Sequence, residues 1–156
     1  MNPFIRPGAA LALLVTTAAC GGSAGSRPAP ESPAATVTAF MEAVHANRLV
    51  TMGDLWGSTR GPARSYMDRN ELEQRLTVIR TYLVHESFTI LESNEAVLRA
   101  APGERVLSVR LVRGNCRPVV PFTLVQHRSG WLVKAIDLEA VGNPARRCGS
   151  DPTRSR

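Results

Sequence analysis

The fold is decided by residues 105–124, which read RVLSVRLVRGNCRPVVPFTL. In both halves of this stretch every second residue is apolar, while Ser108, Arg110, Arg117 and Thr123 fall on the opposite face. The Gly114-Asn115 pair between the two halves is typical of a two-residue hairpin turn. Such a turn pairs Arg113 with Cys116. One face of the two strands then carries the apolar residues Leu107, Val109, Leu111, Pro118, Val120, Phe122 and Leu124. A shift by one residue would mix these side chains with polar ones, so the pattern predicts an antiparallel hairpin in this register.

Strands are also predicted on both sides of this hairpin. Alternation around Phe88 and Ile90 indicates a strand before it. After it, Ser129-Gly130 is expected to turn the chain into a last strand at residues 131–138. The sheet is therefore expected to contain about four antiparallel strands.

The orientation of the last strand depends on the length of the loop before it. With two loop residues, Val133, Ala135 and Asp137 share the apolar face, and Asp137 lies opposite Phe122. A loop with an odd number of residues reverses the two faces.

Helices are predicted ahead of the sheet. The first begins at Ser32, which can cap it, has Pro33 in its first turn, and ends near Asn47. Its apolar stripe consists of Val37, Phe40, Met41 and Val44. A short second helix, which stops at Gly57, has the stripe Leu49, Met52, Leu55 and Trp56.

A third helix is predicted to start at Asp68, because Asp68 and Glu71 form a variant of the capping box. Its apolar stripe consists of Leu72, Leu76, Ile79 and Leu83. Residues 58–63 before it are rich in turn formers and are expected to form a loop.

Helices followed by antiparallel strands predict an α+β fold. Residues 34–148 have the length of one domain with a single core. Residues 20–33 are rich in Gly, Ser, Ala and Pro and are expected to form a flexible linker. Residues 149–156 are expected to be a disordered tail.

Residues 1–20 resemble the signal peptide and lipobox of bacterial lipoproteins. A positive charge at Arg6 precedes a short apolar run, and small residues beginning at Thr17 stand directly before Cys20. The resemblance implies that residues 1–19 are removed and that acyl chains on Cys20 anchor the chain to a membrane. Thr17 stands where the family usually has leucine. The alternatives are a secretory signal cleaved elsewhere and a retained membrane helix, for which the apolar run is too short.

An exported, lipid-anchored protein follows from this resemblance. Gly21 stands where enteric systems of this kind have the aspartate that retains lipoproteins at the inner membrane. A position on the outer membrane, facing the periplasm, is therefore compatible with the sequence.

The cysteine count agrees with lipidation. Once Cys20 carries lipid, Cys116 and Cys148 remain as a pair in an oxidising compartment, and we expect a structural disulfide between them. The sequence contains no C-x-x-C redox pair and no local signature of a thiol nucleophile.

The charge distribution and the spacing of possible metal ligands argue against two other classes of function, nucleic-acid binding and metal binding. The formal net charge is +6, but the basic residues are scattered arginines, with Lys134 as the only lysine, and no recognition motif is visible. We therefore expect no nucleic-acid partner. The three histidines stand far apart, and neither Cys116 nor Cys148 has a neighbour at zinc-site spacing, so we expect no metal and no cofactor.

The order of helices and strands resembles a nuclear transport factor 2-like domain, the cone-shaped fold shared with SnoaL-type and ketosteroid-isomerase-type proteins. The segments that carry the resemblance are 36–44 (TVTAFMEAV), 52–56 (MGDLW) and 130–134 (GWLVK). It implies a curved sheet and helices around a conical pocket. Such a pocket binds small apolar ligands, transfers protons or is filled by side chains. A cystatin-like sheet wrapped around one helix is the alternative.

An isomerase-type enzyme would need a carboxylate base in the cone and donors for an oxyanion. Asp137 is the candidate base. The full set of pocket candidates is Trp56, Tyr66, Tyr82, His85, Phe122 and Asp137. None of them aligns residue by residue with the family's catalytic positions. We therefore expect a non-catalytic envelope domain that binds a small apolar ligand or an envelope protein, with an Asp137 enzyme and a purely structural lipoprotein as alternatives.

Overall fold

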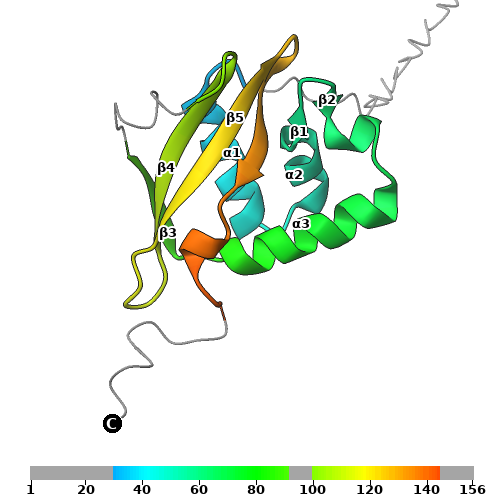
Figure 1. Cartoon of the computed structure of the whole chain (residues 1–156). Coiled ribbons are helices and arrows are strands. Elements are labelled where there is room, and N and C mark those ends of the chain that lie inside the picture. The colour runs from blue at the N-terminus through cyan, green and yellow to red at the C-terminus, as the bar shows by residue number, and fades with distance from the viewer. Residues whose placement is uncertain (1–29, 92–99, 145–156) are drawn as a thin grey trace, which may run out of the picture.

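The computed structural model describes residues 30–91 and 100–144 (Figure 1). In chain order, the elements are α1 (Pro33–His45), α2 (Leu49–Leu55), β1 (Gly57–Ser58), β2 (Gly61–Pro62), η1 (Ala63–Ser65), α3 (Arg69–Leu83), β3 (Ser87–Leu91), β4 (Glu104–Val112), β5 (Val119–His127), β6 (Gly130–Ile136) and η2 (Glu139–Val141). The long strands form one antiparallel sheet in the order β3-β4-β5-β6, and β1 pairs separately with β2. This confirms the α+β prediction of three helices ahead of a four-stranded antiparallel sheet. The predicted signal peptide, the linker up to residue 29 and the tail lie outside the described residues.

Both predicted helix starts are confirmed by side-chain caps. Ser32 Oγ accepts the Ala35 N–H at 3.1 Å, and α1 ends just before Asn47, which takes a positive φ of 54°. At α3, Asp68 Oδ1 accepts the N–H groups of the second and third helical residues at 2.9 and 3.0 Å. These caps fix where the two helices begin.

The central hairpin has the predicted register. Arg113 pairs with Cys116 across the turn, and Leu107 lies opposite Phe122. The inner face of β4 and β5 is buried at Val109, Leu111, Val120, Phe122 and Leu124. Cys116 is disulfide-bonded. Its predicted partner, Cys148, lies outside the described residues, so the pairing stays a prediction.

The last strand differs from the expectation. The β5–β6 turn is one residue earlier than predicted, because His127 pairs with Gly130. A β-bulge then interrupts the ladder: Leu124 pairs with Val133, but Thr123 pairs with Ala135, so Lys134 is an extra residue on β6. The bulge reverses the faces of every β6 residue that follows it.

The bulge decides which side chains reach the core. Ile136, not Asp137, lies opposite Phe122, and Ala135 is exposed. The expectation that Ala135 and Asp137 share the apolar face is therefore wrong. The exposed Asp137 carboxylate accepts the N–H groups of Glu139 and of the next residue at 3.1 and 3.2 Å, so it caps η2.

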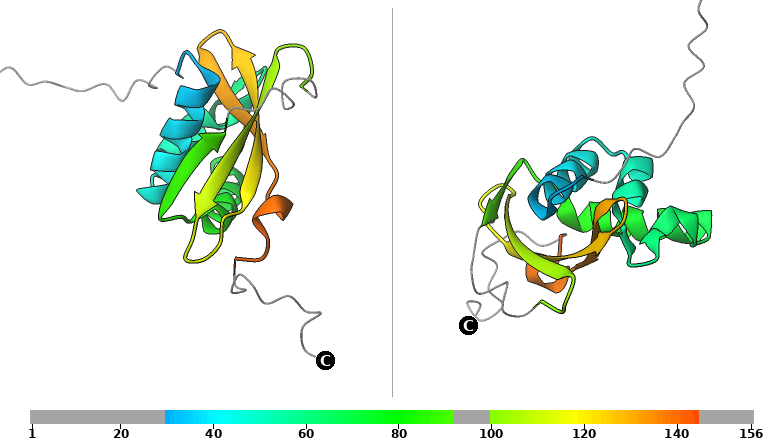
Figure 2. Two further views of the ribbon diagram at one scale, coloured as in Figure 1. Left: turned by 90° about the vertical axis from the view of Figure 1, so that its left-hand side faces the viewer. Right: turned by 90° about the horizontal axis from the view of Figure 1, so that it is seen from above.

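The core fills the space between α1 and the sheet. Figure 2 shows that the sheet curves and that α1 lies against its concave face. The Phe40 ring lies 6.4 Å from the Phe122 ring in an edge contact, and 6.3 Å from the Trp56 ring. The largest side chains of this core with no exposed surface include Phe40, Met41, Met52, Leu111, Phe122 and Leu124. The interior is therefore packed by side chains on both layers.

The start of the described chain covers the free edge of β6. The Trp131 N–H donates to the Pro30 carbonyl at 2.9 Å, and Thr36 Oγ1 lies 3.2 Å from the Trp131 carbonyl. Farther along the same edge, Trp56 forms a parallel bridge with Val133. These contacts satisfy edge groups that would otherwise be open to another strand.

Candidate functional site

None of the three cavities described here is lined by more than one of the six predicted pocket residues. Phe122 is fully buried in the core, and Trp56 is half-buried against Phe40. Asp137 is exposed and caps η2. The space between α1 and the sheet therefore contains no carboxylate from Asp137.

The other three candidates lie elsewhere. The Tyr66 hydroxyl donates to Ser58 Oγ at 3.1 Å, and the guanidinium carbon of Arg60 lies 4.5 Å from the centre of its ring. Tyr82 packs half-buried against the core. His85 is buried between the end of α3 and the start of β3. Each of these side chains has a structural role of its own.

Residues 58–63 were expected to form a loop, but Gly57–Ser58 pairs with Gly61–Pro62 to form the β1–β2 hairpin. A Cβ at Gly57 would lie 2.3 Å from the Gly61 carbonyl oxygen, so only glycine allows the two strands to approach here. The hairpin packs against β6, and η1 then leads the chain to α3. This path places Arg64 of η1 beside the junction of α2 and α3.

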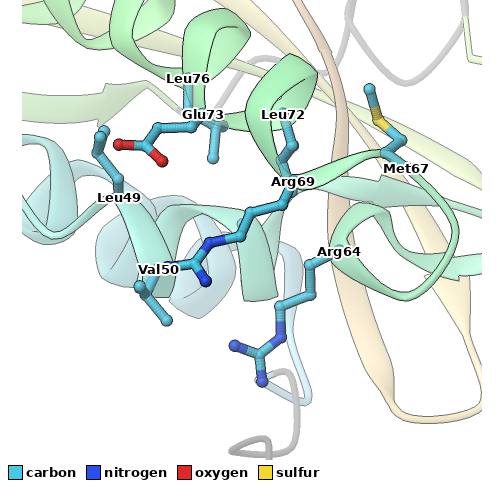
Figure 3. Close-up of a pocket in the computed structure, with 9 residues that line it drawn as sticks. Leu49, Val50, Arg64, Met67, Arg69, Leu72, Glu73 and Leu76 are labelled. Carbon is cyan, nitrogen blue, oxygen red and sulfur yellow. The ribbon is translucent and has the colours of Figure 1, made fainter.

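The largest of the three cavities described here lies at that junction, outside the core, with a volume of about 510 Å³. We call it the α2–α3 groove. Its lining residues are Leu49, Val50, Gly53, Arg64, Met67, Arg69, Leu72, Glu73 and Leu76, of which all but Gly53 are labelled in Figure 3. None of the six predicted pocket residues is among them.

The floor of the groove is apolar because two helices cross there. Leu72 and Leu76 project from the buried stripe of α3. A Cβ at Gly53 of α2 would lie 3.4 Å from a methyl group of each leucine, so the backbone of α2 lies close to both side chains here. Val50, one helical turn earlier, is 68% exposed. This is a large exposed fraction for a valine beside other apolar side chains.

Charged groups stand at the mouth of the groove. Arg64 Nε lies 2.5 Å from Asp54 Oδ1, and the Asp54 side chain is only 16% exposed. Burial raises the pKa of Asp54 above its ordinary value, while the positive charge of Arg64 and the hydrogen bond from it act in the opposite direction. The ion pair thus holds the Arg64 guanidinium in one place.

Arg69 is the second arginine that lines the α2–α3 groove. Its side chain makes no hydrogen bond or ion pair with any residue in the described ranges, although Glu73 follows one turn later on the same helix. Figure 3 shows Arg69 reaching toward Val50, with the Glu73 carboxylate nearer Leu49. The groove therefore combines an apolar floor with an unpaired guanidinium.

Two smaller cavities contain one predicted residue each. Trp56 lines a cavity of about 480 Å³ on the other side of α3, together with Val78, Ile136 and Leu138 among others. His85 lines one of about 330 Å³ with Glu42, His45, Glu86, Ser87 and Phe88. Within residues 30–91 and 100–144, no group of three or more His, Cys, Asp or Glu side chains is placed to hold a metal ion.

His85 closes the C-terminal end of α3. Its Nδ1 lies 2.8 Å from the carbonyl oxygen of Leu83, the last residue of the helix, and its ring meets the edge of Phe88 at 5.4 Å. Burial lowers the pKa of His85, and the charge of His45, whose ring lies 5.6 Å away, lowers it further. The hydrogen bond to Leu83 acts in the opposite direction.

This burial predicts a pH-dependent stability. Because the pKa of His85 is below its ordinary value of 6.5 in the folded state, the unfolded chain binds the proton more readily. The free energy of unfolding should therefore fall as the pH drops below about 6.5 toward the folded-state pKa. Urea unfolding of the wild type and of His85→Asn at several pH values measures this effect.

The His85→Asn variant is expected to lose most of the pH dependence of the free energy of unfolding. The control variant His127→Asn, at the far end of β5, should retain it. The groups that face His85 are Glu42 and His45 from α1 and Glu86, which directly precedes β3. An equally steep decrease in the His85→Asn protein would assign the dependence to those groups instead.

Among the described residues that line the α2–α3 groove, no nucleophile stands beside a base. The groove was not predicted from the sequence. Val50 was the one sign of it there, because it is an apolar residue outside the buried stripe of α2.

Among the described residues, no helix combines the length and the apolar character needed to cross a bilayer. Comparisons with family models, with curated proteins and with solved structures give no match for this chain.

Proposed function

We propose that this chain is a membrane-tethered, non-catalytic binding domain of a bacterial cell envelope. In this proposal, acyl chains on Cys20 anchor the protein, the α2–α3 groove binds its ligand, and residues 20–29 are the linker that spaces the folded part from the membrane. The linker is shorter than the expected 20–33, because Pro30 is bonded to β6 and Pro33 begins α1. The proposal includes the nuclear transport factor 2-like resemblance, supported by the order of elements and by the curvature of the sheet around α1.

One observation carries the binding part of the proposal. The interior between α1 and the sheet is filled by Phe40, Phe122 and their neighbours, while the largest described cavity is an open groove on the helical side. A filled interior favours function at the surface, where an exposed apolar floor is available for a ligand.

The enzyme alternative loses its main support. A general base must reach the proton that it removes, in a site from which water can be excluded. Asp137 is exposed, and its carboxylate is occupied by two backbone N–H groups. No observation on the described residues favours an Asp137 enzyme over a binding domain.

The tether is tested by following lipid on the full chain in a bacterial host. Cells fed an alkyne-labelled fatty acid are expected to label the wild type and the Cys148→Ala control, but not Cys20→Ala. The Cys20→Ala chain should also accumulate as the longer, uncleaved precursor, because cleavage before the cysteine follows its modification. An unlabelled wild-type chain would overturn the membrane tether.

The binding face is tested by a photo-reactive amino acid placed at Val50 in the same cells. Val119, 40% exposed on the sheet, is the matched control. Irradiation is expected to give a specific adduct, seen as a mass increase, at Val50 and not at Val119. Absence of an adduct at Val50 would overturn the groove as the binding face.

A further inference from the structure

We propose that the α2–α3 groove binds a small anionic amphiphile, with a carboxylate or phosphate head at Arg69 and an apolar chain along the floor. This inference rests on the proposed function, since it names the ligand class for the same groove. The floor consists of Leu49, Val50, Met67, Leu72 and Leu76.

The apolar chain is inferred from the exposure of the floor. Val50 is 68% exposed while its neighbours on α3, Leu72 and Leu76, are buried. A ligand chain lying on Val50 would remove this surface from water and extend the core outward between the two helices. Met67 borders the same space with a flexible side chain, which adapts to chains of different shape.

The anionic head is inferred from the charges. Arg69 has no partner among the described residues, and Arg64, held by Asp54, adds a second guanidinium to the same lining. Among the described residues, Glu73 is the only carboxylate that lines the groove. Asp68 already accepts the first free N–H groups of α3, so a bound anion meets the guanidinium and not the helix end.

The size of the groove favours a small molecule over a protein. Its volume of about 510 Å³ lies in the range of small-ligand pockets, about 300–1,000 Å³. The exposed side of α3 carries the polar residues Asn70 and Thr77 between the groove and the cavity at Val78. A stable protein interface would need a larger continuous patch, about 800 Å² on each partner.

The head group and the chain are tested separately with defined probes. The full chain carrying Cys20→Ala, which has no acyl chains of its own to compete, is titrated with decanoate and decyl phosphate below their micelle concentrations. Decanol is the neutral control, and acetate and inorganic phosphate are the controls without a chain. Chemical shifts of the Gly53 amide and the Met67 methyl group report on the groove.

Both amphiphiles are expected to give saturable shifts, with a dissociation constant at least about tenfold below that of decanol. The tighter of the two identifies the head group as a carboxylate or a phosphate. Acetate and inorganic phosphate should give no saturable shift at these two residues. Equal affinity for decanol, or no saturable shift with either amphiphile, would overturn the inference.

Two variants locate the binding, each with a matched control. Arg69→Gln is expected to weaken decanoate binding about tenfold, whereas Arg110→Gln on the exposed face of β4 should leave it within about twofold. Val50→Asp should weaken binding at least as much, because it removes apolar contact and adds a negative charge; Val78→Asp is its control. Circular dichroism confirms that all four variants are folded.

Failure of this inference is distinguishable from failure of the proposed function. A protein adduct at Val50 without amphiphile binding would overturn the amphiphile and retain the binding face. No adduct at Val50 would overturn both. Unchanged affinity in both Arg69→Gln and Val50→Asp would place the amphiphile outside the groove and overturn the inference.

Discussion

Replacing Phe122 by alanine is expected to lower the free energy of unfolding by about 3–5 kcal/mol. Phe122 has no exposed surface, and its ring packs edge-on against Phe40 in the space between α1 and the sheet. Two costs add up in this loss. The burial of a large apolar side chain is lost, and a cavity remains that the two layers cannot close. Since domains of this size have only about 5–15 kcal/mol of stability, this is a large fraction of the total.

Chemical denaturation of the purified protein, followed by tryptophan fluorescence and by circular dichroism, measures this loss. Val119→Ala on the same strand, where the side chain is 40% exposed, should change the value by about 0.5 kcal/mol or less. A loss below about 1 kcal/mol at Phe122 would mean that the interior is an open pocket and not a packed core.

Removal of the disulfide is the second large effect. Cys116 is disulfide-bonded at the tip of the β4–β5 hairpin. If its partner is Cys148, the bond closes a loop of about thirty residues, and Cys116→Ser should lower the free energy of unfolding by about 3 to 4 kcal/mol. The effect arises because the cross-link restricts the unfolded chain, which becomes free to expand when the bond is absent.

A double-mutant cycle tests both the magnitude and the pairing. If Cys116 and Cys148 form the bond, Cys116→Ser, Cys148→Ser and the double variant should all lose the same stability. The reduced wild type should match them. Additive losses in the double variant would show that the two cysteines are not partners.

Features that depend on neighbouring residues were predictable from the sequence. Ser32 and Asp68 cap α1 and α3 because a side chain with an oxygen acceptor stands directly before each apolar stripe. The register of β4 and β5 was predictable for a similar reason: a two-residue turn joins Arg113 to Cys116 and fixes every later pair.

The last strand shows where local reasoning ends. The alternation after Gly130 reads as an unbroken strand, but Lys134 is an extra residue opposite Thr123 and Leu124. A bulge follows from the fit of the twisted sheet around the helices, which no local pattern records. The assignment of Asp137 to the interior depended on an unbroken strand and was wrong for that reason.

The α2–α3 groove could not be read from the sequence, because it arises where separate elements meet. Arg64 comes from η1, Arg69 from the first turn of α3, and Val50 from α2. Each is unremarkable within its own segment. The β1–β2 hairpin, expected to be a loop, determines how these segments approach one another.

The contact between Pro30 and β6 has a mechanical consequence. Any pull on the chain ahead of Pro30 reaches the folded part where the two layers meet, because the Pro30 carbonyl is held by Trp131 while Ser32 caps α1. Tension is thereby divided between the sheet and the helix before it can unwind the first turn of α1. If the chain is tethered ahead of Pro30 as proposed, both contacts have to break before α1 frays from its first residue.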